Sequence, residues 1–202
     1  MPKKIREYKN TLVRQQEIID AAGNVIVKYG SEHLTIRKIA QEVGIAEGTI
    51  YKHFGSKREI LSLLADNIGD LLTIDIERNR TNSHSPLEIL GNAVRSQLLA
   101  ITQSKGMAFQ VIAEIVSLGD KQLKEKIHDI IDKYTSLIRD LLSEGVKKGE
   151  IREDIDLDTV ASLIFNTVEG LSCLWIMDNY NFNLEQRGES LYRFLCETIK
   201  KR

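Results

Sequence analysis

Proline, cysteine and hairpin-forming dipeptides are scarce in this chain of 202 residues. It has only two prolines, Pro2 and Pro86, so almost nothing interrupts a helix along most of its length. The dipeptides that form tight β-hairpins are nearly absent. Apolar residues make up 42% and charged residues 28% of the chain, as in a soluble globular protein with a sizeable core. We therefore predict an all-α protein.

The residues that build metal sites and catalytic sites are equally sparse. Cys173 and Cys196 lie in separate apolar segments and form no C-x-x-C pair, and the four histidines lack metal-ligand spacing. No nucleophile elbow and no P-loop is visible. We expect buried, reduced thiols in a cytoplasmic protein, with no metal, no cofactor and no catalytic residues, and hence not an enzyme.

Residues 159–177 are the longest apolar stretch, and they raise the question of a membrane span. Glu169 is the only charged residue among them and lies near the middle, with Asn166 close by. A charge at the centre of a spanning helix costs about 2.5–3.5 kcal/mol on the insertion scale. Residues 3–10 are polar, and no signal-peptide core follows them. We therefore predict a helix buried in the protein and no membrane association.

Charge is distributed unevenly, although the net charge is only −1. Residues 1–59 contain 11 basic and 7 acidic residues, a net charge of +4, and the remaining 17 basic and 22 acidic residues give −5. A basic N-terminal part attached to an acidic body is typical of a nucleic-acid-binding module joined to another domain. We interpret residues 1–10 as a polar arm that is either solvated or reaches DNA.

The stretch TIRKIAQEVGIAEGTIYKHFGSK, residues 35–57, predicts two short helices joined by a tight turn. Gly44 ends the first helix, because glycine adopts the left-handed conformation without steric cost. The second helix, residues 47–54, has Ile50 and Phe54 on one face and polar side chains on the other. A short helix of this kind is typical of a helix-turn-helix, whose second helix enters the DNA major groove.

Helical periodicity and capping signals predict nine helices in all. Ser85, Pro86 and Glu88 form an N-terminal capping signal, and Ser56 with Glu59 forms another. The polar residues 79–85 predict a loop. The expected helices begin near residue 12, at 35, at 47 and near 57, at 86, at 107 and 121, near 157 and at 184.

The residues of this stretch resemble the N-terminal signature of TetR-family transcriptional regulators. The match is Thr35-x-Arg37-x-Ile39-Ala40-x-x-Val43-Gly44-Ile45-Ala46-x-Gly48-Thr49-Ile50-Tyr51-x-His53-Phe54-x-Ser56-Lys57 with Ile60 and Leu61. The resemblance implies a three-helix DNA-binding domain, residues 1–57, and a helical ligand-binding and dimerisation domain, residues 58–202. The region around Trp175 is similar to that of the subgroup that senses fatty acyl-CoA.

The resemblance also implies which residues contact DNA. Thr35, Tyr51 and Lys57 would contact phosphate, although Thr35 also suits a plain helix N-cap. Gly48 would allow close approach to DNA. The candidates for the groove are Arg37, Ala46, Glu47, Thr49, Lys52 and His53. Glu47 could accept from a cytosine or simply favour a helix N-terminus, and His53 could instead pack against the first helix.

Apolar helical faces in the acidic body predict a ligand pocket and a dimer interface. Candidate ligand residues are Met107, Phe109, Ile112, Glu114, Tyr134, Ile138, Phe165, Glu169 and Trp175, with ordinary core packing as the alternative for each. Glu169 could pair with Arg139 or Lys133, contact a polar ligand or face a partner subunit. The last two helices would form a homodimer and place two reading helices on a palindromic operator of double-stranded DNA.

The function predicted from the sequence is that of a bacterial homodimeric repressor released from its operator by a small hydrophobic or amphipathic effector. Two alternatives remain open. One is a DNA-binding factor that has no small-molecule ligand and recruits partners, and the other is a transcriptional activator.

Overall fold

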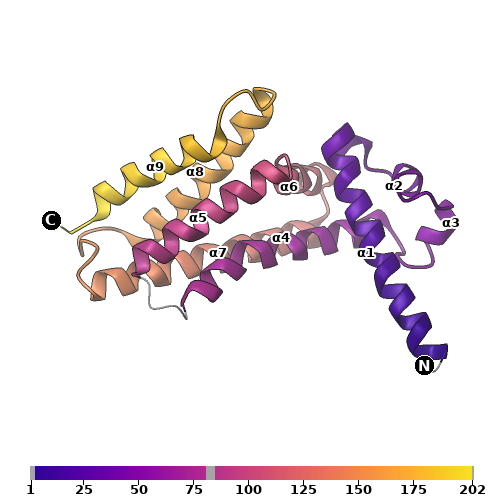
Figure 1. Cartoon of the computed structure of the whole chain (residues 1–202), viewed down its shortest axis with the longest axis horizontal. Helices are drawn as coiled ribbons and strands as arrows, with labels where there is room; N and C mark the ends of the chain where they lie inside the picture. Colours follow the sequence, from indigo (N-terminus) through magenta and orange to yellow (C-terminus); the bar gives the residue numbers. More distant parts are fainter. Residues whose placement is uncertain (1–2, 81–84, 202) are drawn as a thin grey trace. The chain divides into compact units, whose positions relative to one another are not determined.

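The computed structural model describes residues 3–80 and 85–201, and within these residues the chain is almost entirely helical (Figure 1). A single isolated β-bridge joins Ile151 to Lys200 in the described part. The helices are α1 (Lys3–Tyr29), the 3₁₀ turn η1 (Ser31–His33), α2 (Ile36–Val43), α3 (Glu47–Ile50), α4 (Lys57–Arg80), α5 (Pro86–Gln103), α6 (Met107–Leu118), α7 (Lys121–Lys147), α8 (Leu157–Met177) and α9 (Leu184–Ile199). The predicted all-α class with nine α-helices is confirmed over this range.

The beginning of α1 differs from the sequence-based expectation. Residues 1–10 were predicted to form a polar arm, but the helix already starts at Lys3. Lysine, arginine and glutamate have high helix propensity, and no proline occurs between residue 3 and the end of α1, so the polar composition does not prevent a helix. The predicted loop at residues 79–85 is shortened as well, because α4 extends to Arg80. Residues 81–84 of that predicted loop lie outside the described residues.

Capping side chains set several helix starts as the sequence indicated. At α5 the Ser85 hydroxyl accepts from the Glu88 backbone N–H at 3.2 Å, and the Glu88 carboxylate accepts from the Ser85 N–H at 3.0 Å. The second predicted box is only half formed. Ser56 Oγ accepts from the Glu59 N–H at 3.4 Å, but the Glu59 carboxylate accepts from Gly55 instead of Ser56. The glutamate therefore caps a position one residue earlier than predicted.

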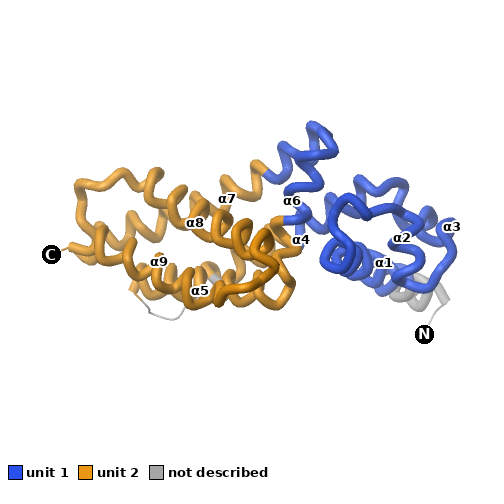
Figure 2. Tube along the Cα trace, turned by 90° about the horizontal axis from the view of Figure 1, so that it is seen from above, with its two compact units in different colours: residues 1–67, 110–127 blue, residues 68–109, 128–202 orange. Residues whose placement is uncertain are grey.

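The helices group into two compact units, shown in Figure 2. The first consists of residues 1–67 and 110–127, and the second of residues 68–109 and 128–202. Buried residues from α1 to α4 form the centre of the first unit, among them Ile18, Ile26, Ile39, Ile50 and Phe54. The burial of Ile50 and Phe54 agrees with their predicted role as apolar anchors of the reading helix. The domain boundary at residue 57 remains a prediction.

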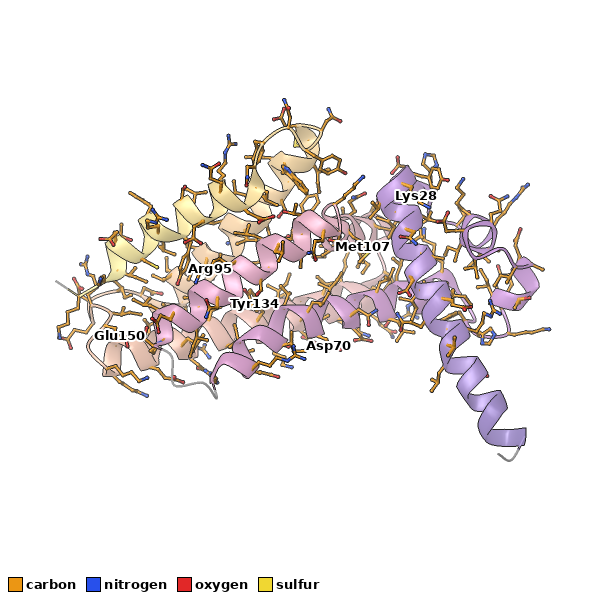
Figure 3. All side chains as sticks on the ribbon, viewed as in Figure 1. Lys28, Asp70, Arg95, Met107, Tyr134 and Glu150 are labelled. Atoms are coloured by element: carbon orange, nitrogen blue, oxygen red, sulfur yellow. The ribbon has the colours of Figure 1, made fainter. Side chains whose placement is uncertain are left out.

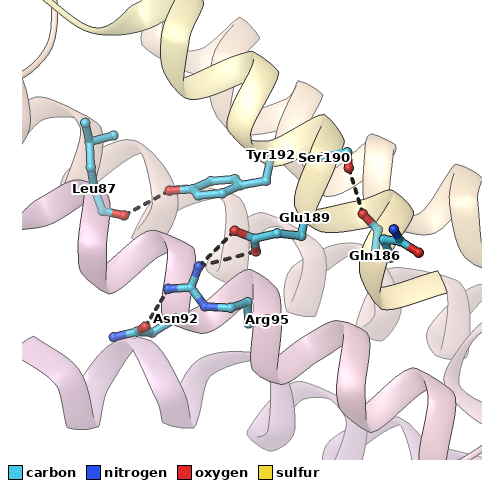
Figure 4. A network of polar contacts seen from close by, with 7 residues as sticks. All are labelled: Leu87, Asn92, Arg95, Gln186, Glu189, Ser190 and Tyr192. Carbon is cyan, nitrogen blue, oxygen red and sulfur yellow. Dashed lines mark hydrogen bonds and ion pairs between the residues drawn. The ribbon is translucent and has the colours of Figure 1, made fainter. Parts of the chain in front are cut away.

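In the second unit α5, α8 and α9 pack against one another around an apolar core. The approach of α9 to α5 is close at Gly188, where an added Cβ would lie 2.5 Å from Leu98 Cδ1. A polar network fixes the register of these helices (Figure 4): Arg95 contacts both carboxylate oxygens of Glu189 at 3.3 Å, and the Tyr192 hydroxyl donates to the Leu87 carbonyl at 2.9 Å. This packing leaves the opposite faces of α8 and α9 open.

Helix α8 is long and apolar enough to cross a membrane by length and composition alone. Eight of its residues are nevertheless buried within the protein, including Ile164, Phe165, Val168 and Trp175, which belong to the core of the second unit. A helix that supplies one face to a protein core explains the apolar stretch without a membrane.

Candidate DNA-binding site

Helices α2 and α3 and the turn between them position the candidate DNA-binding residues. Thr35 is the N-cap of α2, and its hydroxyl accepts from the Lys38 backbone N–H at 3.1 Å. Gly44 ends α2 in the left-handed conformation, with φ of 78°. The N-cap role of Thr35 is thus confirmed, and the phosphate contact proposed for the same residue stays a prediction.

The second helix of the motif is shorter than predicted. Residues 47–54 were expected to be α-helical, but α3 covers only Glu47–Ile50. Its last residues continue as a tighter turn, in which the N–H groups of Lys52 and His53 bond to carbonyls three residues earlier. Such tightening is common where a helix runs into a break, here Gly55. The tighter turn still leaves Phe54 buried beneath the motif.

Most of the predicted DNA contacts lie on the solvent face of this motif. Tyr51 is 56% exposed. Thr35, Arg37, Ala46, Glu47, Gly48, Tyr51 and Lys52 are exposed, and Thr49, His53 and Lys57 are half-buried. No heavy atom lies within 4 Å of a Cβ built on Gly48, so packing within the described protein does not require glycine there. The close approach to DNA expected at Gly48 stays a prediction.

The first helix supports the motif and engages His53. Gln15 of α1 donates to the His53 carbonyl at 3.5 Å, and His53 shares a small hollow with residues of α1 from Thr11 to Glu17. Its Nδ1 is buried and has no hydrogen-bond partner among the described residues. This arrangement favours the interpretation that His53 packs against the first helix. Lys28 of α1 also pairs with Glu42 of α2, which fixes the two helices to each other.

The base of α4 is held by ion pairs that the sequence did not reveal. Lys57 Nζ lies 2.6 Å from Glu114 of α6, Arg58 lies 2.9 Å from Asp120, and Lys126 lies 2.6 Å from Asp66. These partners are separated by about 60 positions in sequence, and no local motif signals them. All of them belong to the first unit.

The nine candidate ligand residues are divided between the two units. Ile112 and Glu114 belong to the first, and the other seven belong to the second. Tyr134, labelled in Figure 3, donates to Gln97 at 2.9 Å and meets the Phe165 ring edge-on at 6.1 Å. Trp175 donates to the Phe182 carbonyl at 3.0 Å.

Glu169 is the candidate ligand residue that stands out electrostatically. No hydrogen-bond or ion-pair partner reaches its carboxylate among the described residues, and Arg139, one predicted partner, pairs with Asp158 instead. Burial raises the pKa of Glu169 to about 7. Glu169 is half-buried, and a carboxylate without a partner in such a place is unusual because burying a charge is costly.

A helix-turn-helix with an exposed polar reading face, joined to a helical body, defines a DNA-binding regulator. Family models support this class along nearly the whole chain: "Bacterial regulatory proteins, tetR family" matches residues 18–64, and "YsiA-like protein, C-terminal region", a TetR C-terminal model, matches residues 65–198. The chain belongs to the TetR family of bacterial transcriptional regulators.

Similar proteins of known name extend over the same length. The fatty acid metabolism regulator protein of Bacillus subtilis (strain 168) is 27% identical over 92% of this chain and 95% of its own. The crystal structure of the regulator FadR from Bacillus subtilis in complex with stearoyl-CoA has a TM-score of 0.79, covering 91% of this chain and 98% of that one. Nucleoid occlusion factor SlmA of Vibrio vulnificus (strain YJ016) is 21% identical over 93% of this chain and 96% of its own. None of these similar proteins is an enzyme by name.

Proposed function

We propose that this protein is a cytoplasmic homodimeric repressor that leaves a palindromic operator when an acyl-CoA thioester binds its helical body. The observation that carries the proposal is the exposed reading face of α2 and α3 on a chain that is similar over 91% of its length to a regulator bound to stearoyl-CoA. The family membership supplies DNA binding and regulation. The dimer, the operator contacts and the ligand class are the proposed parts.

The outer faces of α8 and α9 support the dimer. Met177 is 73% and Phe194 is 71% exposed in the single chain. Leu163, Leu174 and Leu191 are exposed on the same two helices. An apolar groove of about 270 Å³ lies alongside, lined by residues of α5, α8 and α9 that include Leu163, Leu191 and Phe194. Exposed apolar side chains at this density are typical of an interface, and a two-fold axis would cover both copies at once.

The ligand is expected elsewhere, since none of the nine candidate ligand residues lines this groove. Five of them, Tyr134, Ile138, Phe165, Glu169 and Trp175, belong to α7 and α8 of the second unit, and all but Glu169 are part of its apolar core. An acyl chain suits such surroundings because its methylenes gain about 0.8 kcal/mol each on leaving water. The effector would act by favouring a dimer geometry in which the spacing between the two reading helices no longer matches one turn of DNA.

Stearoyl-CoA is the probe for the effector. A duplex obtained by binding-site selection is labelled with a fluorophore, and its anisotropy is followed as protein is added with and without stearoyl-CoA. We expect the acyl-CoA to weaken DNA binding at least tenfold, a coupling of about 1.4 kcal/mol or more, whereas free CoA has no effect. Unchanged DNA binding across acyl chain lengths would instead favour a DNA-binding factor without a small-molecule ligand.

Variants of Arg37 and Tyr51 distinguish base recognition from phosphate contact. Arg37→Ala should relax preference at one base position, because an arginine that pairs with guanine contributes about 1–3 kcal/mol of discrimination. Tyr51→Phe should weaken binding to every sequence alike, by about 1 kcal/mol for a lost hydrogen bond. Repeating the binding-site selection with each variant measures both effects. A base preference unchanged by Arg37→Ala would remove Arg37 from the groove.

A further inference from the structure

Lys57 and Glu114 form the most protected ion pair of the first unit. The ammonium Nζ and the carboxylate Oε1 lie 2.6 Å apart, and their side chains are 27% and 11% exposed. Glu114 is itself a buried residue of α6, beside the core residues Val111 and Ile115. Burial strengthens the attraction between the two charges and makes it costly to leave either one without a partner.

Neighbouring charges do not offer Glu114 another cation. Arg58, the next residue along α4, pairs with Asp120 and also contacts Gln122. Lys126 donates to both Ser62 and Asp66. Each basic group at the base of α4 thus has its own acidic partner, and Glu114 is paired with Lys57 alone among the described contacts.

We infer that Glu114 is a positioning residue that competes with DNA phosphate for Lys57 and thereby sets DNA affinity without touching DNA. The inference rests on the proposed phosphate contact of Lys57. A lysine ammonium is a compact charge on a flexible stem, able to exchange one anion for another. Transfer to phosphate breaks the pair with Glu114, and bridging both anions brings carboxylate and phosphate close together. In both cases Lys57 contributes less free energy to DNA binding than an unpaired lysine would.

The test is a double-mutant cycle on DNA affinity, read by fluorescence anisotropy with a selected duplex and an unrelated duplex. Glu114→Gln keeps the shape but removes the charge, and should raise affinity for both duplexes about fivefold. Lys57→Met should lower it by a similar factor. In the Lys57→Met background, Glu114→Gln should change nothing, because the lysine for which Glu114 competes is gone. Glu125→Gln, an exposed carboxylate of the same unit, controls for the change in net charge.

Besides the loss of the phosphate contact itself, two results would overturn the inference. One is an unchanged affinity of Glu114→Gln, and the other is an equal gain from Glu114→Gln in the Lys57→Met background, which would indicate a general field effect. A null effect of Lys57→Met would remove the phosphate contact and the inference with it, whereas the proposed function itself fails only if the wild-type protein binds no duplex. Thermal unfolding checks that each variant is folded. If Glu114→Gln is not, Glu114→Asp, whose shorter carboxylate reaches less far, should give a smaller gain that also vanishes with Lys57→Met.

Discussion

Replacing Phe194 with glutamate is expected to convert the proposed dimer into a monomer and to lower operator affinity by about 100-fold or more. Phe194 is 71% exposed in the single chain, so a glutamate there should leave the fold of the monomer intact. In a dimer, two carboxylates would meet apolar surface and each other without a partner, a costly burial of charge. Two linked reading helices also bind far more tightly than one, because the second contact is intramolecular.

Light scattering after size-exclusion chromatography measures the molar mass, and anisotropy with a palindromic duplex measures DNA binding. Leu118→Glu is the matched control, since Leu118 is an exposed apolar residue, 46% accessible, at the end of α6. This control should remain dimeric and bind DNA as the wild type does. A dimeric Phe194→Glu would place the interface on another surface, and a monomeric variant with full operator affinity would show that dimerisation is not needed for binding.

Replacing Glu169 with glutamine is expected to stabilise the protein at pH 8 by roughly 2–3 kcal/mol and to have almost no effect at pH 4.5. Burial raises the pKa of this carboxyl from 4.5 to about 7 in the folded protein. The folded state therefore holds the proton between these values while the unfolded state has lost it. The contribution of Glu169 to stability is complete below pH 4.5, falls as the pH rises to about 7, and is constant above. Glutamine resembles the protonated form of Glu169, so the variant does not lose stability as the pH rises.

Urea unfolding of the two proteins between pH 4.5 and pH 8 measures the difference in the free energy of unfolding. The difference between the two proteins cancels the pH-dependent contributions of the other carboxylates to stability. One of these is Asp156, whose pKa is lowered by backbone hydrogen bonds at the N-terminus of α8, so that its contribution to stability is lost as the pH falls. Glu153→Gln changes an exposed carboxylate and should give a flat difference. A flat difference for Glu169→Gln as well would mean that its carboxylate is solvated or paired in the assembled protein.

Local signals in the sequence predicted most helix starts and the position of the reading motif, although its second helix is shorter than predicted. Periodicity and the cap at Ser85 placed the later helices within a residue or two of their observed starts. These signals work because a helix boundary depends on side chains only three or four positions away. The same range explains the error in α1, where helix propensity alone decides between a polar helix and a polar arm.

Contacts between distant parts of the chain could not be predicted in this way. The ion pair of Lys57 with Glu114, for example, joins residues 57 positions apart in the sequence. Nor did local signals reveal how Tyr192 and Arg95 join α9 to α5. Such pairs depend on how the helices pack, and their sequence pattern is only that of polar residues on a helix.

The discontinuous first unit has a consequence for synthesis on the ribosome. Its helix-turn-helix is complete by residue 57, but the unit also includes residues 110–127. A nascent chain therefore cannot assemble this unit until more than half of the protein has been made, because Glu114, Asp120 and Lys126 are among its late residues. A truncated message would yield a reading motif without these partners for the base of α4. The ion pairs that hold the base of α4 therefore form only after residues 114–126 have been made.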